Sequence, residues 1–188
     1  MYVSYANFTG NSNKPDIYVA VSSDCGKTFA KPIKITSGGN KNQGTSSAID
    51  PLTGAVYIVW RGFFIPAAPG SPAVPDQILM SKSTDGGKTW SKPTTVTSAF
   101  NPYDQGSTGV SIRTLDFPSV AVSVGANGQS RVHVAWSQRK VAPSTAPPSY
   151  ALSVGHPGRL ATPASWSRPP PTAARPSASQ RRSTMPTP

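Results

Sequence analysis

Three arginines stand where strand-like runs of the sequence end or begin. Arg61 directly follows Trp60, Arg139 closes the run that contains Trp136, and Arg113 lies in a segment leading into another run. A guanidinium group matches a carboxylate in a bidentate way, so arginines gathered at strand ends could hold an acidic ligand. The alternative is that they are solvated or pin loops. Both interpretations stay open from the sequence.

Carboxylates that could assist catalysis are few. All seven acidic residues are aspartates, and the sequence contains no Glu. Asp76, Asp104 and Asp116 fall in expected loops, and the sequence identifies no partner for them. No acid/base pair, and therefore no catalytic residue, is predicted.

Metal, thiol and disulfide chemistry are not expected. Cys25 is the single cysteine, and the two histidines, His133 and His156, lie far apart without metal-ligand spacing. The sequence predicts no metal and no cofactor. It also has no apolar run long enough to insert into a membrane.

An eight-residue pattern, Ser-x-Asp-x-Gly-x-Thr-aromatic, occurs twice, and the second copy begins 61 residues after the first. The flanking residues match at the same offset. The shared positions are Ser22, Asp24, Gly26, Thr28 and Phe29 in the first copy, and Ser83, Asp85, Gly87, Thr89 and Trp90 in the second. A repeat of this length made of short strand-like runs indicates an array of similar β-units.

Each copy has the composition of a hairpin turn. We expect Asp24 and Asp85 to accept hydrogen bonds from backbone N–H groups two residues on, and the glycines to supply positive φ. Phe29 and Trp90 would turn inward as apolar anchors. The pattern therefore predicts a structural role, with Asp85 important for stability and Arg61 of little importance to it.

The pattern resembles the Asp-box, or BNR repeat, of sialidases and related β-propellers. Residues 46–60 and 118–136 are similar to the strand–turn–strand hairpins that open blades in such proteins. The resemblance implies an all-β fold of antiparallel four-stranded blades, about two to two and a half of them, over residues 1–142. Each Asp-box would lie between the third and fourth strands of a blade.

The resemblance also implies a function. Sialidases of this kind use a tyrosine nucleophile with a glutamate, an aspartate acid/base and three arginines that clamp the substrate carboxylate. The chain lacks Glu, and Arg61 through Pro66 does not match the family's Arg-Ile-Pro element. We expect a fragment of a secreted or cell-surface sialidase-like glycosidase, inactive alone, with Arg61, Arg113 and Arg139 as ligand-binding candidates. The alternative is a non-catalytic propeller that binds glycans or proteins.

The net charge of +11 is concentrated late in the chain, because residues 117–188 carry eight Lys/Arg and no acidic residue. No basic face with base-reading groups is visible, so nucleic acid is not an expected partner. Residues 143–188 form a Pro/Ala/Arg-rich segment for which we expect a disordered tail, either a linker or a frameshifted segment. The expected partners are a glycan or glycoprotein and the remaining blades of the propeller.

Overall fold

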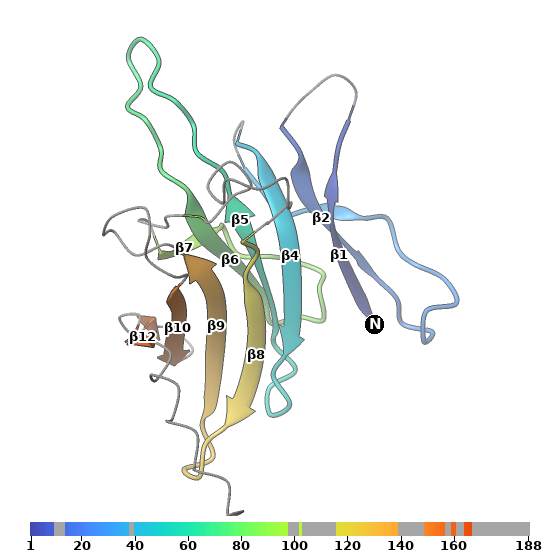
Figure 1. Cartoon of the computed structure of the whole chain (residues 1–188). Helices are drawn as coiled ribbons and strands as arrows, with labels where there is room; N and C mark the ends of the chain where they lie inside the picture. Colours follow the sequence, from blue (N-terminus) through green and yellow to red (C-terminus); the bar gives the residue numbers. More distant parts are fainter. Residues whose placement is uncertain are drawn as a thin grey trace, which may run out of the picture.

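The computed structural model describes residues 1–9, 14–37, 40–97, 102 and 116–138, and the backbone of strands within 149–166. Within this part of the chain all regular structure is β, and every strand pairing is antiparallel. The strands form three sheets that stand side by side (Figure 1). The predicted all-β fold of antiparallel sheets is confirmed.

The first sheet has three strands in the order β1-β2-β3. These are β1 (Tyr2–Asn7), β2 (Asp16–Val21) and the short β3 (Ile33–Lys34). β2 is the buried strand of this sheet, because Ile17 and Val19 are inaccessible to solvent. The first copy of the repeat lies between β2 and β3.

The second sheet has four strands in chain order. They are β4 (Asn42–Ile49), β5 (Val56–Gly62), β6 (Gln77–Ser83) and β7 (Thr94–Thr97). The second copy of the repeat follows β6 and precedes β7, the third and fourth strands of this sheet. The 61-residue offset brings β2 onto β6 and β3 onto β7.

The third sheet has five strands. They are β8 (Ser119–Val124), β9 (Ser130–Gln138), β10 (Ser149–His156), β11 (Arg159–Leu160) and β12 (Ala164–Trp166). β10 pairs with β9 on one side and with β11 and β12 on the other. These last three strands fall within residues 143–188, the range predicted as a tail. The division at residue 142 stays a prediction.

The first strands of the three sheets lie together. β4 contacts both β1 and β8, and hydroxyl groups join them across the sheet boundaries. Thr45 Oγ1 donates to the carbonyl of Ser4 at 3.0 Å, and the backbone N–H of Val120 donates to Ser46 Oγ at 3.2 Å. The sheets therefore fan out from a shared inner row of strands.

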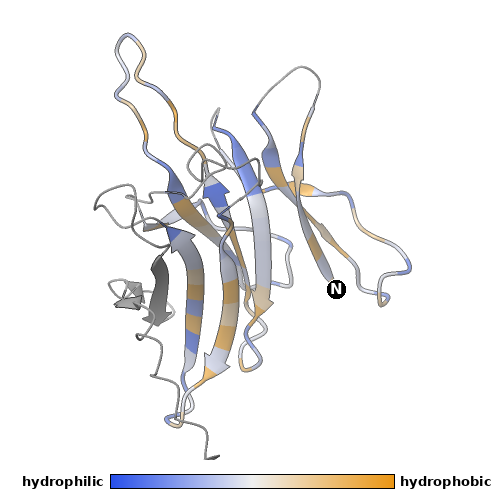
Figure 2. Cartoon of the chain, in the orientation of Figure 1, coloured by the Kyte–Doolittle hydropathy of each residue, from blue (hydrophilic) through white to orange (hydrophobic). Residues whose placement is uncertain are grey.

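Two apolar layers separate the sheets, and β5 contributes to both. Ile58 and Trp60 pack with Ile17 and Val19 of the first sheet. On the other face, Tyr57 and Val59 pack in a second layer with residues of β9, namely Val132, Val134 and Trp136. Every residue of β5 is buried, whereas β8 and β9 alternate between apolar and polar positions (Figure 2). The second sheet is thus the middle layer of the fold.

Candidate functional site

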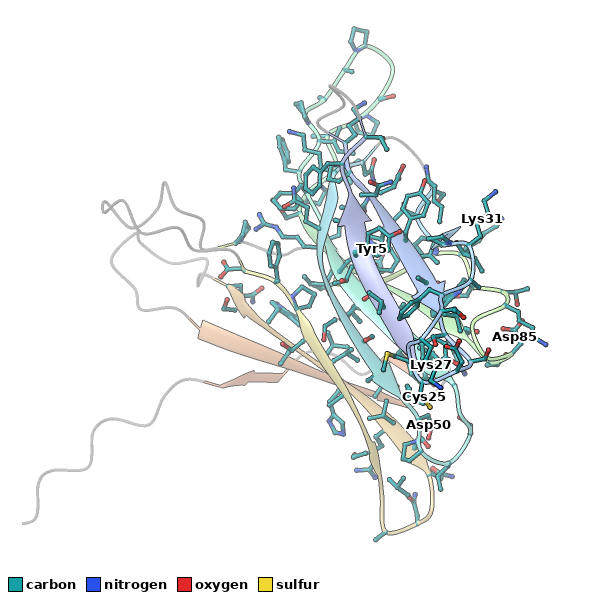
Figure 3. All side chains as sticks on the ribbon, turned by 90° about the vertical axis from the view of Figure 1, so that its right-hand side faces the viewer. Tyr5, Cys25, Lys27, Lys31, Asp50 and Asp85 are labelled. Atoms are coloured by element: carbon teal, nitrogen blue, oxygen red, sulfur yellow. The ribbon has the colours of Figure 1, made fainter. Side chains whose placement is uncertain are left out.

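The two groups of residues singled out by the sequence lie at opposite ends of the strands. Arg61 is close to the end of β5, and Asp85 follows the end of β6, which runs antiparallel to β5. We call these ends the Arg61 end and the turn end. Figure 3 shows Cys25, Asp50 and Asp85 in the lower part of the molecule, toward the turn end.

Arg61 is buried and ion-paired. Its Nε lies 2.8 Å from Oδ1 of Asp76, and the arginine is 1% exposed. The guanidinium carbon also lies 4.2 Å from the centroid of the Phe63 ring, a cation–π contact. Asp76, for which the sequence identifies no partner, therefore holds Arg61. This geometry argues against the expectation that Arg61 matters little for stability, because removing one partner of a buried ion pair costs about 3–5 kcal/mol.

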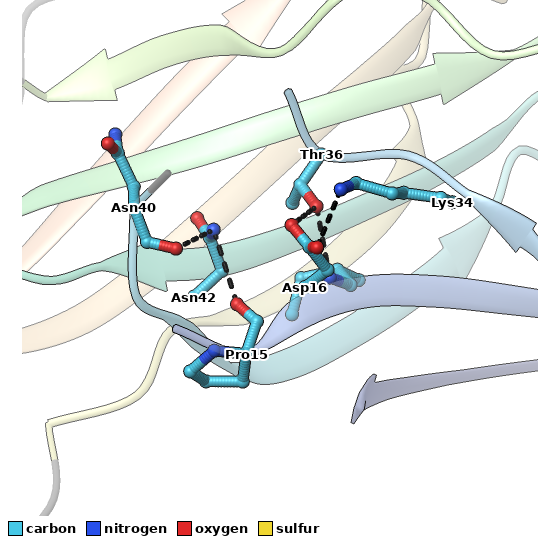
Figure 4. Close-up of polar contacts among 7 residues, drawn as sticks. Pro15, Asp16, Lys34, Thr36, Asn40 and Asn42 are labelled. Atoms are coloured by element: carbon cyan, nitrogen blue, oxygen red, sulfur yellow. Dashed lines mark hydrogen bonds and ion pairs between the residues drawn. The ribbon is translucent and has the colours of Figure 1, made fainter. Parts of the chain in front are cut away.

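Asn42, which sequence reasoning missed, organises the strand starts beside Arg61. Its side-chain Oδ1 accepts the indole N–H of buried Trp60 at 2.9 Å, and its Nδ2 donates to the carbonyl of Asn40 at 3.0 Å. Its backbone N–H donates to the carbonyl of Pro15 at 3.0 Å. This buried network ties the start of β4 to the entry of β2 (Figure 4).

Asp16 forms a second polar cluster at this end, on the first sheet (Figure 4). Lys34 Nζ lies 2.6 Å from one carboxylate oxygen, and Thr36 Oγ1 donates to the other at 2.7 Å. The bond to Asp16 raises the pKa of Lys34. Lys34 and Asp16 neutralise each other within this cluster, which links β2 to the segment of β3 and Thr36 at the Arg61 end of the first sheet.

Asp116 lies on the approach to β8. It is buried and accepts a hydrogen bond from Ser137 Oγ of β9. The neighbouring Phe117 ring packs on Gly44 of β4, whose φ is +70°. A Cβ at residue 44 would lie 2.1 Å from that ring, so only glycine permits this approach between the second and third sheets.

The remaining predicted ligand residues, Arg113 and Arg139, and the loop carboxylate Asp104 lie outside the described residues. Within the described ranges, no group of His, Cys, Asp or Glu is arranged to hold a metal ion. The described part also has no helix long and apolar enough to cross a membrane. The residues that the structure brings together at the Arg61 end are thus Arg61, Asp76 and Asn42.

At the turn end, the first copy of the repeat folds into a hydrogen-bonded loop around Asp24. Its carboxylate accepts from the backbone N–H of Thr28 at 2.9 Å, from Thr28 Oγ1 at 2.6 Å and from Ser22 Oγ at 2.7 Å. The hydroxyl and N–H of Thr28, followed by Ser22, lower the pKa of Asp24 to about 2. The N–H that binds belongs to the residue four positions on, rather than two as expected.

The second copy repeats this arrangement around Asp85. Its carboxylate accepts from the backbone N–H groups of Lys88 and Thr89, each at 3.0 Å, and from Ser83 Oγ at 2.8 Å. The Thr89 hydroxyl also donates to it, and this bond is the main reason that the pKa of Asp85 falls well below its usual range. Ser83 Oγ, which donates to Asp85, also accepts a hydrogen bond from the Gly87 N–H at 2.9 Å.

The aromatic positions of the two copies differ. Trp90 packs against the apolar layer that contains Ile17, Val19 and Ile35, and its indole N–H donates to the carbonyl of Gly87 at 3.1 Å. Phe29 is 43% exposed. The prediction of an inward anchor is therefore wrong for Phe29, because no sheet packs over this side of the first sheet within the described residues.

A third turn, between β4 and β5, is joined to the third sheet. Asp50 is 1% exposed and accepts from Ser130 Oγ at 2.6 Å, Thr53 Oγ1 at 2.7 Å and Leu52 N–H at 2.9 Å. Ser130 is the main cause of a pKa lowered to about 2 for Asp50. Sequence reasoning missed this link, since the two residues lie 80 positions apart.

Comparison of the fold with solved structures finds the Hadza microbial sialidase Hz136, with a TM-score of 0.56 over 87% of this chain at 17% sequence identity. The chain has a sialidase-like β fold. It spans 35% of the length of that sialidase. No family model and no curated protein matches the sequence, so the likeness is one of fold.

Proposed function

We propose that this chain is part of a sialidase-like Asp-box propeller that binds glycans at the Arg61 end, and that the complete propeller cleaves terminal sialic acid. The observation that carries the proposal is the structural likeness to a sialidase over 87% of the chain. The two hydrogen-bonded Ser-x-Asp-x-Gly-x-Thr turns support it, because they resemble Asp-boxes. A secreted or cell-surface location is proposed on the same grounds.

The role of this chain within the proposed enzyme is mainly that of a scaffold. Its sequence has no Glu to pair with a tyrosine nucleophile. Arg61 is already engaged by Asp76 and buried, so it would act by fixing the strand end rather than by reaching a substrate. Arg113 and Arg139 are the remaining proposed contacts to an acidic sugar.

A non-catalytic glycan- or protein-binding propeller is the second candidate. The observation that favours it is the Arg61–Asp76 pair, which neutralises an arginine that a sialidase would need free for a substrate carboxylate. Under this alternative the complete protein would bind a ligand without turning it over.

Hydrolysis of a fluorogenic sialoside tests the proposal, with the chain measured both alone and within its complete propeller. We expect turnover by the complete propeller and none by the chain alone. Arg113→Ala and Arg139→Ala should weaken binding of sialyllactose, while the matched control Arg131→Ala, on β9, should not. Binding without turnover by the complete propeller would favour the second candidate, and neither binding nor turnover would contradict both.

A further inference from the structure

Exposed apolar side chains are concentrated on the first sheet. Among the described residues, nine large apolar side chains are exposed, and five of them belong to this sheet or to the segments next to its strands: Met1, Val3, Tyr5, Phe8 and Phe29. Val3 and Tyr5 are 42% and 36% exposed, although they lie in the middle of β1. A grouping of this kind is typical of an interaction surface.

The strand register places four side chains on one face of the first sheet. Val3 pairs with Ala20, and Tyr5 pairs with Tyr18, and residues directly opposite each other share a face. The rings of Tyr5 and Tyr18 are stacked, with centroids 6.1 Å apart. The other face of β2 packs against the second sheet through Ile17. The face that points away from the second sheet, which we call the outer face, therefore consists of Val3, Tyr5, Tyr18 and Ala20 (Figure 3).

The repeat indicates what kind of structure covers such a face. The 61-residue offset brings β2 onto β6, so their partner strands, β1 and β5, also correspond. Tyr5 then takes the position of Trp60. By the same register, Val3 takes the position of Ile58. Trp60 and Ile58 are inaccessible to solvent in the apolar layer between the first two sheets. The outer face thus has the positions through which one sheet packs on another, yet it is exposed.

The chemistry of the outer face allows it to meet a second copy of itself. It consists of apolar carbon and two tyrosine hydroxyls, each of which can both donate and accept a hydrogen bond. Lys34, the residue across from Tyr18 on β3, is neutralised by Asp16. Lys27 and Lys31 belong to the turn and to the segment after it, outside this face (Figure 3). Two outer faces can therefore meet without repulsion between like charges, as a twofold contact requires.

The free face of the third sheet has a different character. On β9, Arg131 and His133 alternate with the buried Val132 and Val134, so they lie on the side away from the second sheet. Ser123 Oγ of β8 lies 2.7 Å from His133 Nε2 on this side. Packing this polar face on an apolar one would take its polar groups out of water without giving them partners. A second outer face is therefore the better match for the outer face than the third sheet of another copy.

We propose that two copies of this chain associate through their outer faces, in a twofold dimer whose first sheets stack face to face. Val3 and Tyr5 of each copy lie at the centre of the contact, where side chains from two sheets about 10 Å apart interdigitate. The contact buries the aromatic and β-branched side chains that the first sheet leaves in solvent. It involves neither Arg113 nor Arg139, so it is independent of the proposed glycan binding.

Sedimentation velocity of the full chain tests this proposal. We expect a change from monomer to dimer between about 1 and about 200 μM, because small interfaces give weak dimers. Tyr5→Lys should weaken dimerisation by at least about tenfold, since it places a charge in each half of an apolar contact. Val3→Lys is a second variant with the same expected effect. Ile49→Lys, at a residue 52% exposed on β4, is the matched control and should dimerise like the parent. Thermal unfolding checks that each variant is folded.

Three results would overturn the proposal. The first is a chain that stays monomeric at about 200 μM, which would leave a sheet from another polypeptide segment as the partner of the outer face. The second is dimerisation of unchanged strength in folded Tyr5→Lys and Val3→Lys. The third is loss of association in Ala135→Lys, at an exposed position on the free face of the third sheet, because that loss would indicate head-to-tail contact. Binding or turnover of a sialoside has no bearing on these results.

Discussion

The two repeat turns have nearly the same internal hydrogen bonds but different surroundings. In both, an aspartate carboxylate closes the loop on a threonine four residues later. The second turn also touches the neighbouring sheet, because Gly87 approaches Tyr2 and Val21 closely and Trp90 packs against the apolar layer between the two sheets. The internal bonds therefore shape the turn, and the glycine and the aromatic residue fasten one sheet to the next.

The largest expected difference between the turns concerns their glycines, Gly26 and Gly87, which have φ values of +87° and +86°. A Cβ at residue 87 would lie 2.8 Å from Tyr2 and Val21, whereas at residue 26 the nearest atom is the flexible Met1 Sδ at 3.1 Å. Gly87→Ala should cost about 2–4 kcal/mol, from backbone strain plus overpacking. Gly26→Ala should cost about 1–2 kcal/mol, from strain alone. Denaturant unfolding measures both, and equal losses would contradict the fastening role.

The aromatic positions should differ by less. Trp90→Ala should lower the free energy of unfolding by about 2–3 kcal/mol, because it removes a half-buried ring from the layer between sheets. Phe29→Ala should cost under about 1 kcal/mol, since the ring is largely in solvent. If Phe29→Ala lowered the free energy of unfolding as much as Trp90→Ala in the same assay, the Phe29 ring would have to be covered by other residues.

Acid should weaken both turns alike. Because the folded-state pKa values of Asp24 and Asp85 are lowered, their contribution to stability is complete above the unfolded pKa of about 4. For Asp24 this contribution is lost as the pH falls from about 4 to about 2, and for Asp85 the loss extends to lower pH. Asp24→Asn and Asp85→Asn should therefore each reduce the fall in melting temperature between about pH 6 and about pH 3. An unchanged fall in both variants would mean that the carboxylates do not hold the turns.

The smallest expected effect on stability comes from substitutions of the residue that follows each aspartate. Cys25 has a φ of +61°, in the left-handed region, where the second turn has Gly86 at +75°. Cys25→Gly should stabilise the chain by about 1 kcal/mol, and Gly86→Ala should destabilise it by a similar amount. Thermal unfolding under reducing conditions checks both, and a loss of stability in Cys25→Gly would contradict the strain argument.

The sequence predicts those features whose interactions are local. Ser83, Asp85 and Thr89 lie within one short loop, so their residue types alone indicate a turn closed by side-chain hydrogen bonds. The offset between the two copies similarly aligns β2 with β6, because strand pairing here follows chain order. Local chemistry and repetition together predict the antiparallel all-β fold.

The parts that the sequence does not predict depend on contacts between distant segments. Arg61 and Asp76 lie 15 positions apart in the sequence, and Ser130 and Asp50 lie 80 positions apart. Whether an aromatic residue is covered, as Trp90 is and Phe29 is not, depends on which sheets stack. Neither the pairing of charges nor the stacking of sheets can be read from residue type, because each follows from the twist and packing of whole strands.

The complete burial of β5 has a consequence for the unfolded chain. Residues 55–60 read Ala-Val-Tyr-Ile-Val-Trp, an uncharged, proline-free run rich in β-branched and aromatic side chains, which is the composition of segments that stack into cross-β fibrils. Asp50 and Pro51 stand ahead of this run and Arg61 directly after it, in the flanking positions where charges and prolines oppose such stacking. The strand that both neighbouring sheets cover is thus the segment whose exposure most favours self-association, and we expect Asp50, Pro51 and Arg61 to limit aggregation of the unfolded chain.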